Sequence, residues 1–502
     1  MRRKKAFLNI ATALLLEIIT VLVGLVVPRL IIGAFGSATN GLVNSITQFL
    51  GYIALLQSGV GSVIRAALYK PLAHKDHHTL CVMVKTTENF FKKIGYATIA
   101  YIVVLSVAFP MFIAQQYDFI FTASLVIIIG ISTAAQYLWG ITYQMVLEAD
   151  QCAYVYSLVQ IITVVFNAIC TVALINLGCS IQVVKLASSL LFVLRPVIVN
   201  LYGKKKYKVI SDVEIDNDLI SQRWDGMAQA IAYFIHTKTD VFVLTILSTL
   251  ENVSIYSVYM LITNGLTALI NCVDKAIRAV FGNIIAKQEG EALKETFNAY
   301  SLSIHILSTI CFSTACVTVF SFVRVYTHGI TDAEYIQPLF GTLIISAEYL
   351  YCLRMPYNAI INAAGKFRET KQSAYIEAIL NIVISLLFVH RYGLVGVAIG
   401  TLSAMLYRSI SFIRFLHRDT LHLKYSKEVK RYMVSFILYL GIIDASKRIH
   451  YSPSNYSGWI LFAGIVFLCI SAIVLAVFCL TDFVSAKVLY RMVLGKKVEG
   501  LK

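Results

Sequence analysis

The residues best suited to chemistry in this chain are charged side chains that lie inside long apolar stretches. A charge deep in a membrane costs a few kcal/mol, so a residue of this kind usually has a function. Both signs of charge occur at such positions: Glu17, Arg29, Arg65, Lys185, Arg195, Lys238, Asp240, Asp274, Lys275, Glu348, Arg354 and Glu377. Basic residues outnumber acidic ones here, and guanidinium groups bind phosphate oxygens bidentately. The set therefore suits a phosphate-bearing ligand.

Some of these charges are expected to pair with one another or to reach the membrane surface. Lys238 and Asp240 are two residues apart and do not share a helix face, so each needs a partner elsewhere. Arg29 is a suitable partner for Asp240. Snorkelling toward the interface is an equal alternative for four others, namely Lys185, Lys275, Arg195 and Glu377. Asparagine and glutamine side chains inside the same stretches could bind sugars or join neighbouring helices.

No constellation typical of catalysis or of metal binding occurs in the sequence. Serine, histidine and aspartate are scattered, and the histidines of residues 74–78 are expected in a solvated loop. The ten cysteines lie almost wholly in apolar runs without a C-x-x-C pair, so they are interpreted as small core residues. No G-x-x-x-x-G-K-[ST] motif is present. The sequence thus predicts no enzyme, no catalytic residues, no metal and no cofactor.

Composition places these charges in a polytopic membrane protein. Hydrophobic residues make up 58% of the chain and charged residues 14%, whereas soluble domains carry about 25% charged residues. Apolar runs long enough to cross a bilayer recur about fourteen times. They are predicted at 7–34, 41–66, 94–114, 119–147, 153–177, 181–202, 226–250, 253–278, 300–323, 338–362, 373–390, 393–414, 431–448 and 457–480. The expected fold class is all-α integral membrane.

The basic residues determine the expected orientation. The net charge of +16 comes mainly from short segments between apolar runs, which argues against nucleic-acid binding. The densest basic segments are Arg2–Lys5, Arg65–Lys93, Lys204–Lys208, Arg414–Arg431 and Lys487–Lys502. By the positive-inside rule, these segments and both termini are predicted to be cytoplasmic. The outer connections are too short for a soluble enzymatic domain.

A weak internal repeat predicts two lobes. Two segments, one beginning at Pro28 and one at Thr239, have the same order of features. Each contains a charged residue, an apolar stretch, a small polar loop and a second apolar stretch. Six spans separate the two segments, which predicts parallel repeats related by an axis along the membrane normal. The alternative is that all helical hairpins look alike at this level. The predicted domains are an N-lobe at 1–210, a C-lobe at 211–428, and two C-terminal helices with a tail at 429–502.

Four stretches carry a resemblance to a known family. They are residues 9–69, LEADQCAYVYSLVQ at 147–160, TDVFVLTILSTLENVSIYSVYMLI at 239–262, and residues 362–408. In order and spacing the chain resembles the Wzx-type oligosaccharide flippases of the multidrug/oligosaccharidyl-lipid/polysaccharide (MOP) exporter superfamily. The resemblance implies two six-helix lobes around a central cavity, with two further C-terminal helices.

The resemblance also implies a function and a set of binding residues. Such proteins move undecaprenyl-diphosphate-linked repeat units from the cytoplasmic to the outer leaflet of the bacterial inner membrane. Their cationic cavity is matched here by Arg29, Arg65, Lys238 and Arg354. Glu17, Asp240 and Glu377 are the candidates for ion coupling or for pairing with those cations. The implied partners are the lipid-linked oligosaccharide, membrane lipids, and a polysaccharide polymerase with glycosyltransferases.

Other classes of function stay open at this stage. A multidrug antiporter of the same superfamily would use acidic residues in the lobes, and Glu17, Asp240 and Glu377 are compatible with it. A flippase of peptidoglycan precursors would differ in substrate rather than in mechanism. An integral-membrane glycosyltransferase or polymerase would need a large outer loop, which the spacing of the apolar runs does not provide.

Overall fold

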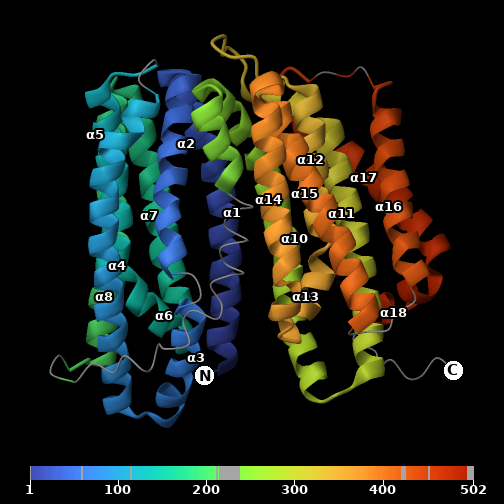
Figure 1. The fold of residues 1–502 in the computed structure, drawn as a ribbon, viewed down its shortest axis with the longest axis horizontal. Coiled ribbons are helices and arrows are strands. Elements are labelled where there is room, and N and C mark those ends of the chain that lie inside the picture. Colours follow the sequence, from blue (N-terminus) through green and yellow to red (C-terminus); the bar gives the residue numbers. More distant parts are fainter. Residues whose placement is uncertain are drawn as a thin grey trace. The chain divides into compact units, whose positions relative to one another are not determined.

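A computed structural model describes residues 2–57, 60–113, 116–210, 213, 238–419, 425–449, 451 and 453–493. Those residues are almost entirely helical and contain no strand (Figure 1). Ten helices among them are long and apolar enough to cross a membrane. The predicted all-α membrane class is therefore confirmed. The predicted count of fourteen spans stays a prediction.

The chain divides into two compact units. The first comprises Met1–Phe234 with Thr249–Ser254, and the second comprises Ile235–Ser248 with Ile255–Lys502. The helices of the first unit are α1 Arg2–Phe35, α2 Ser37–Gly51, α3 Val60–His74, α4 His77–Phe112, α5 Phe119–Ala135, α6 Ile141–Ala149, α7 Ala153–Asn176 and α8 Ile181–Tyr207. A 3-10 turn, η1 Tyr52–Gln57, follows α2, and a π-turn, η2 Gln136–Gly140, joins α5 to α6. The domain boundaries expected at 210 and 428 stay predictions.

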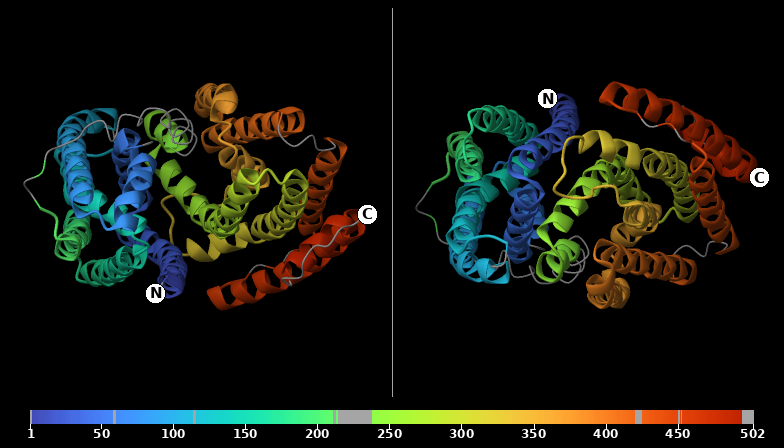
Figure 2. Two further views of the ribbon diagram at one scale, coloured as in Figure 1. Left: turned by 90° about the horizontal axis from the view of Figure 1, so that it is seen from below. Right: turned by 90° about the horizontal axis from the view of Figure 1, so that it is seen from above.

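The second unit begins with a helical segment at 238–247. Its further helices are α10 Leu250–Ala286, α11 Gly290–Tyr326, α12 Pro338–Leu353, α13 Met355–Ala363, α14 Phe367–Tyr392, α15 Leu394–Asp419, α16 Tyr425–Ser446, α17 Tyr456–Thr481 and α18 Phe483–Val493. Both α16 and α17 pack against α11, as the views along the helices show (Figure 2). An apolar layer that includes Val466, Ile470 and Val474 of α17 lies between them.

The turns of the two units repeat in the same order. Left-handed backbone occurs at Lys75 between α3 and α4, and at Gln288 between α10 and α11. It occurs again in two later pairs of equivalent turns, Gln151 with Gly365 and Gly178 with Gly393, whereas Gly329 between α11 and α12 has no counterpart among the described residues between α4 and α5. The members of each pair are separated by nearly the same number of residues. Left-handed backbone is rare outside glycine, so its recurrence in register is independent evidence for an internal repeat.

Several predicted loops prove to be helical extensions. The segments 67–93 and 279–299 were expected to be cytoplasmic loops, but α3 continues to His74, α4 begins at His77, and α10 and α11 are separated only by residues 287–289. A helix of 36 residues such as α4 is about 54 Å long, well beyond the ~30 Å of a bilayer core. The apolar pattern marks only the part of each helix that is expected in lipid. The backbone hydrogen bonding of the helix continues beyond that part, so the helix is longer than the apolar run.

Candidate functional site

A buried ion-pair cluster in the second unit joins three helical elements. Glu377 of α14 lies between Arg354, at the junction of α12 and α13, and Arg408 of α15. The Arg354 Nη1 to Glu377 Oε1 distance is 2.6 Å, and the Arg408 Nε to Glu377 Oε2 distance is 3.4 Å. The three side chains are only 8–9% exposed. Among the described residues, two cations share the Glu377 carboxylate, and Glu348 lies close enough to Arg354 to interact with it electrostatically.

Both arginines have further contacts that fix their positions. Arg408 Nη1 donates to the Ser373 hydroxyl at 2.7 Å and to the Thr370 carbonyl at 3.3 Å, both on α14. Its guanidinium carbon lies 4.3 Å from the centre of the Phe412 ring. The Arg354 guanidinium lies over the Tyr351 ring at 5.0 Å. These cation–π contacts and hydrogen bonds compensate part of the desolvation of the two guanidinium groups.

A second buried polar group in the same unit surrounds Asp240. Its carboxylate accepts hydrogen bonds from Thr401 Oγ1 at 2.8 Å, Tyr256 at 3.0 Å and Asn381 at 3.5 Å. These donors are neutral, and among the described residues they take the place of the cation that was expected beside Asp240. Glu348 of α12 is a further acid nearby, half-buried, with Thr267 Oγ1 at 3.5 Å. A carboxylate with neutral donors can take up a proton or a small cation, because it is not already neutralised.

The first unit holds a chain of polar contacts around Arg65. Arg65 Nη1 lies 3.1 Å from Glu148 Oε2, and the other oxygen of Glu148 accepts from Gln144 at 3.0 Å. Gln144 in turn accepts a hydrogen bond at 3.3 Å from Gln136, which belongs to the π-turn η2. Arg65 is 38% exposed, so water and a ligand can reach its free N–H groups.

Arg195 of the first unit occupies a position similar to that of Arg408 in the second. Its Nε and Nη2 donate to the Thr163 hydroxyl at 3.2 and 3.1 Å. The contact joins α7 to α8, as the Glu377–Arg408 pair joins α14 to α15. Arg195 of the first unit therefore contacts a neutral hydroxyl, whereas Arg408 of the second unit contacts a carboxylate.

The remaining predicted site residues are Arg29, Glu17 and Lys238. Arg29 is half-buried on α1, one turn before Gly33, where an added Cβ would meet its Nη1 at 3.2 Å. Glu17 is exposed on the same helix among apolar neighbours. Lys238 is half-buried at the start of the 238–247 helix. The structure brings together Arg354 and Glu377 from the predicted set. A common cavity for all four cations stays a prediction.

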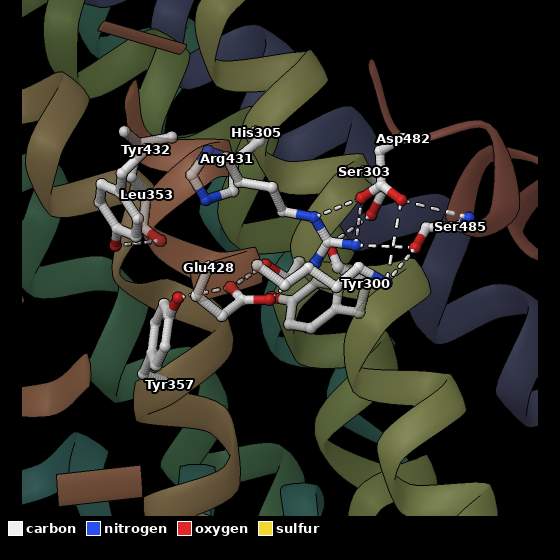
Figure 3. A network of polar contacts seen from close by, with 12 residues as sticks. Tyr300, Ser303, His305, Leu353, Tyr357, Glu428, Arg431, Tyr432, Asp482 and Ser485 are labelled. Carbon is white, nitrogen blue, oxygen red and sulfur yellow. Dashed lines mark hydrogen bonds and ion pairs between the residues drawn. The ribbon is translucent and has the colours of Figure 1, made fainter. Parts of the chain in front are cut away.

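A third polar network joins the C-terminal helices to other helices of the second unit (Figure 3). Glu428 of α16 accepts from Tyr357 at 2.6 Å, from Ser301 at 3.1 Å and from Arg431 at 2.9 Å. Arg431 continues to Asp482 at 2.6 Å, at the start of α18. Burial raises the pKa of Asp482, but the charge and hydrogen bonds of Arg431 outweigh it and hold that pKa below its usual range.

Sequence reasoning missed several members of these networks. Arg408 and Glu148 are charged residues near the inner ends of predicted spans, a position where snorkelling is common and draws no attention. Glu428, Arg431 and Asp482 lie at the edges of apolar runs, and sequence reasoning overlooked them for the same reason. Charge within an apolar run was the available signal for Arg408. Its pairing with Glu377 depends on packing between α14 and α15 and has no signature in sequence spacing.

Comparison with solved structures defines the class. An inward-facing MATE-family multidrug transporter of the MOP superfamily is 15% identical over 86% of this chain and 96% of its own, with a TM-score of 0.59. A Vibrio cholerae MATE transporter mutant is 14% identical over 84% and 98%, with a TM-score of 0.58. A MOP-superfamily transporter from Pyrococcus furiosus is 15% identical over 89% and 95%, with a TM-score of 0.54. That transporter is described as having a binding pocket of reverse polarity, which suggests a different function for it.

These similarities show the fold and no more. The chain has the MATE-like fold of MOP-superfamily membrane transporters, a multi-pass architecture. No protein-family model and no curated protein matches the sequence. The structures named above are of transporters rather than enzymes.

Proposed function

We propose that this protein flips an undecaprenyl-diphosphate-linked oligosaccharide from the cytoplasmic to the outer leaflet of a bacterial inner membrane. One observation carries the proposal: Arg354 and Arg408 lie together on the carboxylate of Glu377 in a nearly buried cluster. Two guanidinium groups are costly to bury, and a further anion stabilises them. A diphosphate headgroup supplies such an anion, and arginine is well suited to bind it.

The first unit adds cationic groups of the same kind. Arg65 is paired yet partly exposed, and Arg195 has a hydroxyl partner in the Thr163 contact. Arg29 adds a third guanidinium on α1. A diphosphate cannot cross hydrocarbon unaided, because a buried unpaired charge costs several kcal/mol or more. Fixed cations that replace its water lower that barrier, while partial exposure keeps binding weak enough for release.

Transport would proceed by alternating access. The cationic groups would hold the headgroup while the lipid tail stays in the bilayer, and the protein would open to one side of the membrane at a time. Both termini would lie in the cytoplasm. Glycosyltransferases would supply the lipid-linked unit, and a polymerase would consume it on the far side.

The cluster around Asp240 favours coupling to a cation in this cycle. Its carboxylate has neutral donors, and Glu348 is a second, half-buried acid close to it. A proton or small cation bound there would neutralise the site during one conformational step. The same acids favour the second candidate, a MATE-like antiporter of organic cations, in which they would bind the substrate directly.

A flipping assay in proteoliposomes tests the proposal. Arg354→Gln removes one guanidinium and leaves the Glu377–Arg408 pair, so no orphan carboxylate results. We expect this variant to flip a fluorescent lipid-diphosphate oligosaccharide at least tenfold more slowly. Lys366→Gln is the control, because Lys366 is also ion-paired, with Glu369 at 3.5 Å, but both side chains are 40–43% exposed. Equal rates for Arg354→Gln and wild type would contradict the proposal.

A further inference from the structure

A small pocket at the base of the C-terminal helices adjoins the third polar network and shares Arg431 and Asp482 with it. It has a volume of about 200 Å³ and lies between the start of α16 and the end of α17. Three cations line it, namely Lys427, Lys430 and Arg431, together with Asp482, Val434 and Phe478. We propose that this pocket binds the phosphate headgroup of an anionic phospholipid from the surrounding membrane, a function beyond the proposed transport.

The lining charges leave a net positive pocket. Asp482 is engaged by Arg431 at 2.6 Å, and Lys427 Nζ lies farther away, at 3.8 Å from its other oxygen. Lys427 Nζ donates to Ser485 at 2.9 Å, and Lys430 Nζ donates to the Thr481 carbonyl at 3.1 Å. Each lysine has further N–H groups for a phosphate oxygen. Burial and the nearby charge of Arg431 lower the pKa of Lys427, as expected where positive charge is incompletely neutralised.

The surface beside the pocket fits acyl chains. Lys430 is followed on one face of α16 by Met433, Ile437 and Leu440, at the three- and four-residue spacing of a helix stripe. These three apolar side chains are 54–67% exposed. A cationic headgroup site continued by an exposed apolar stripe matches an amphiphile better than a free ion.

The dimensions and the neighbouring helix support a lipid over a glycan. Sites for drug-sized molecules usually have volumes of roughly 300–1,000 Å³, so this pocket is too small for an oligosaccharide repeat unit. Helix α18 starts directly beside it and is amphipathic, with Phe483 and Val484 exposed and Ser485 and Val488 buried. Amphipathic helices of this kind lie at membrane surfaces, and basic pockets there bind anionic headgroups.

Lipid binding to the purified full-length protein tests the proposal. Native mass spectrometry in mild detergent would measure the affinity for phosphatidylglycerol and for phosphatidylcholine. Each basic residue near a membrane surface contributes about 1 kcal/mol, so Lys427→Gln with Lys430→Gln should weaken phosphatidylglycerol binding roughly thirtyfold, or about 2 kcal/mol. Glutamine keeps a hydrogen-bond donor for Ser485 and Thr481, which favours normal folding.

The control is the pair Lys204→Gln and Lys205→Gln, two exposed lysines at the end of α8. It should change phosphatidylglycerol binding less than twofold, and phosphatidylcholine binding should be alike in all proteins. Equal losses in both double variants, or no preference for phosphatidylglycerol in the wild type, would overturn the proposal. A separate titration with inorganic phosphate distinguishes the sources of the anion. If phosphate alone displaces the lipid and raises the melting temperature at millimolar concentration, the pocket is a soluble-anion site instead.

Discussion

Replacement of Glu377 by glutamine is the most informative change in the buried cluster. The substitution keeps the shape of the side chain but removes the negative charge that pairs with both Arg354 and Arg408. Two guanidinium groups would then face each other in a nearly buried site. We expect the folded state to be strongly destabilised, and the variant to lose more stability than any single arginine variant of the cluster.

The size of the effect follows from burial. Exposed ion pairs contribute about 0.2–1 kcal/mol, whereas removal of one partner from a buried pair costs about 3–5 kcal/mol. The side chains of the cluster are 8–9% exposed, so the larger figure applies to Glu377→Gln. The control Glu369→Gln lies on the same helix and breaks a pair with Lys366 that is 40–43% exposed. Its cost should stay below about 1 kcal/mol.

Thermal unfolding in one detergent ranks the variants. We expect Glu369→Gln near wild type, Arg354→Gln slightly lower, and Glu377→Gln lowest. The double variant Arg354→Gln with Glu377→Gln should recover part of the loss, because Arg408 keeps its bonds to Ser373 and Thr370. If Glu377→Gln melts together with Glu369→Gln, the cluster is not a buried ion-pair network and the charge argument fails.

Three further predictions concern transport, topology and pH. Arg29→Ala should abolish flipping with normal membrane insertion, and Arg29→Lys should keep part of it; full activity of the alanine variant would remove Arg29 from the mechanism. In a background without the ten native cysteines, Leu177→Cys should react with an impermeant reagent from outside and Lys205→Cys should not; the reverse would invert the topology. Thr39, an outer residue by sequence, is 5% exposed and hydrogen-bonded to Tyr117, so it is a poor reporter. The lowered pKa of Asp482 means that its stabilising pair with Arg431 is present above the ordinary pKa of 3.8 and is lost as pH falls through the lower folded value. The stability difference between wild type and Asp482→Asn, followed by thermal unfolding, should therefore shrink below that pH; a difference independent of pH would refute the assignment.

The fold class followed from the sequence because it depends on local properties. Apolar runs of bilayer length and the order of those runs are readable one segment at a time. Helix ends were harder, since α4 and α10 continue past the apolar window that marks the membrane. The repeat was faint in residue types, yet it is plain in the backbone at Lys75 and Gln288.

The candidate site was only partly accessible to sequence reasoning. Charges such as Arg354, Asp240 and Glu377 stood out because they interrupt apolar runs. Their partners did not, because pairing is decided by packing between helices distant in the chain. Asp240 shows this most clearly: a cation was expected beside it, and its donors among the described residues are the neutral side chains of Tyr256, Asn381 and Thr401.

The most direct test of the central claim is substrate choice by the wild-type protein. In proteoliposomes with an imposed proton or sodium gradient, one would measure flipping of a lipid-diphosphate-linked oligosaccharide and, in parallel, uptake of a fluorescent organic cation. The two arginines of the Arg354–Glu377–Arg408 cluster predict rapid flipping of the diphosphate lipid and no transport of the cation. Transport of the organic cation without flipping of the lipid would contradict the account and favour an antiporter.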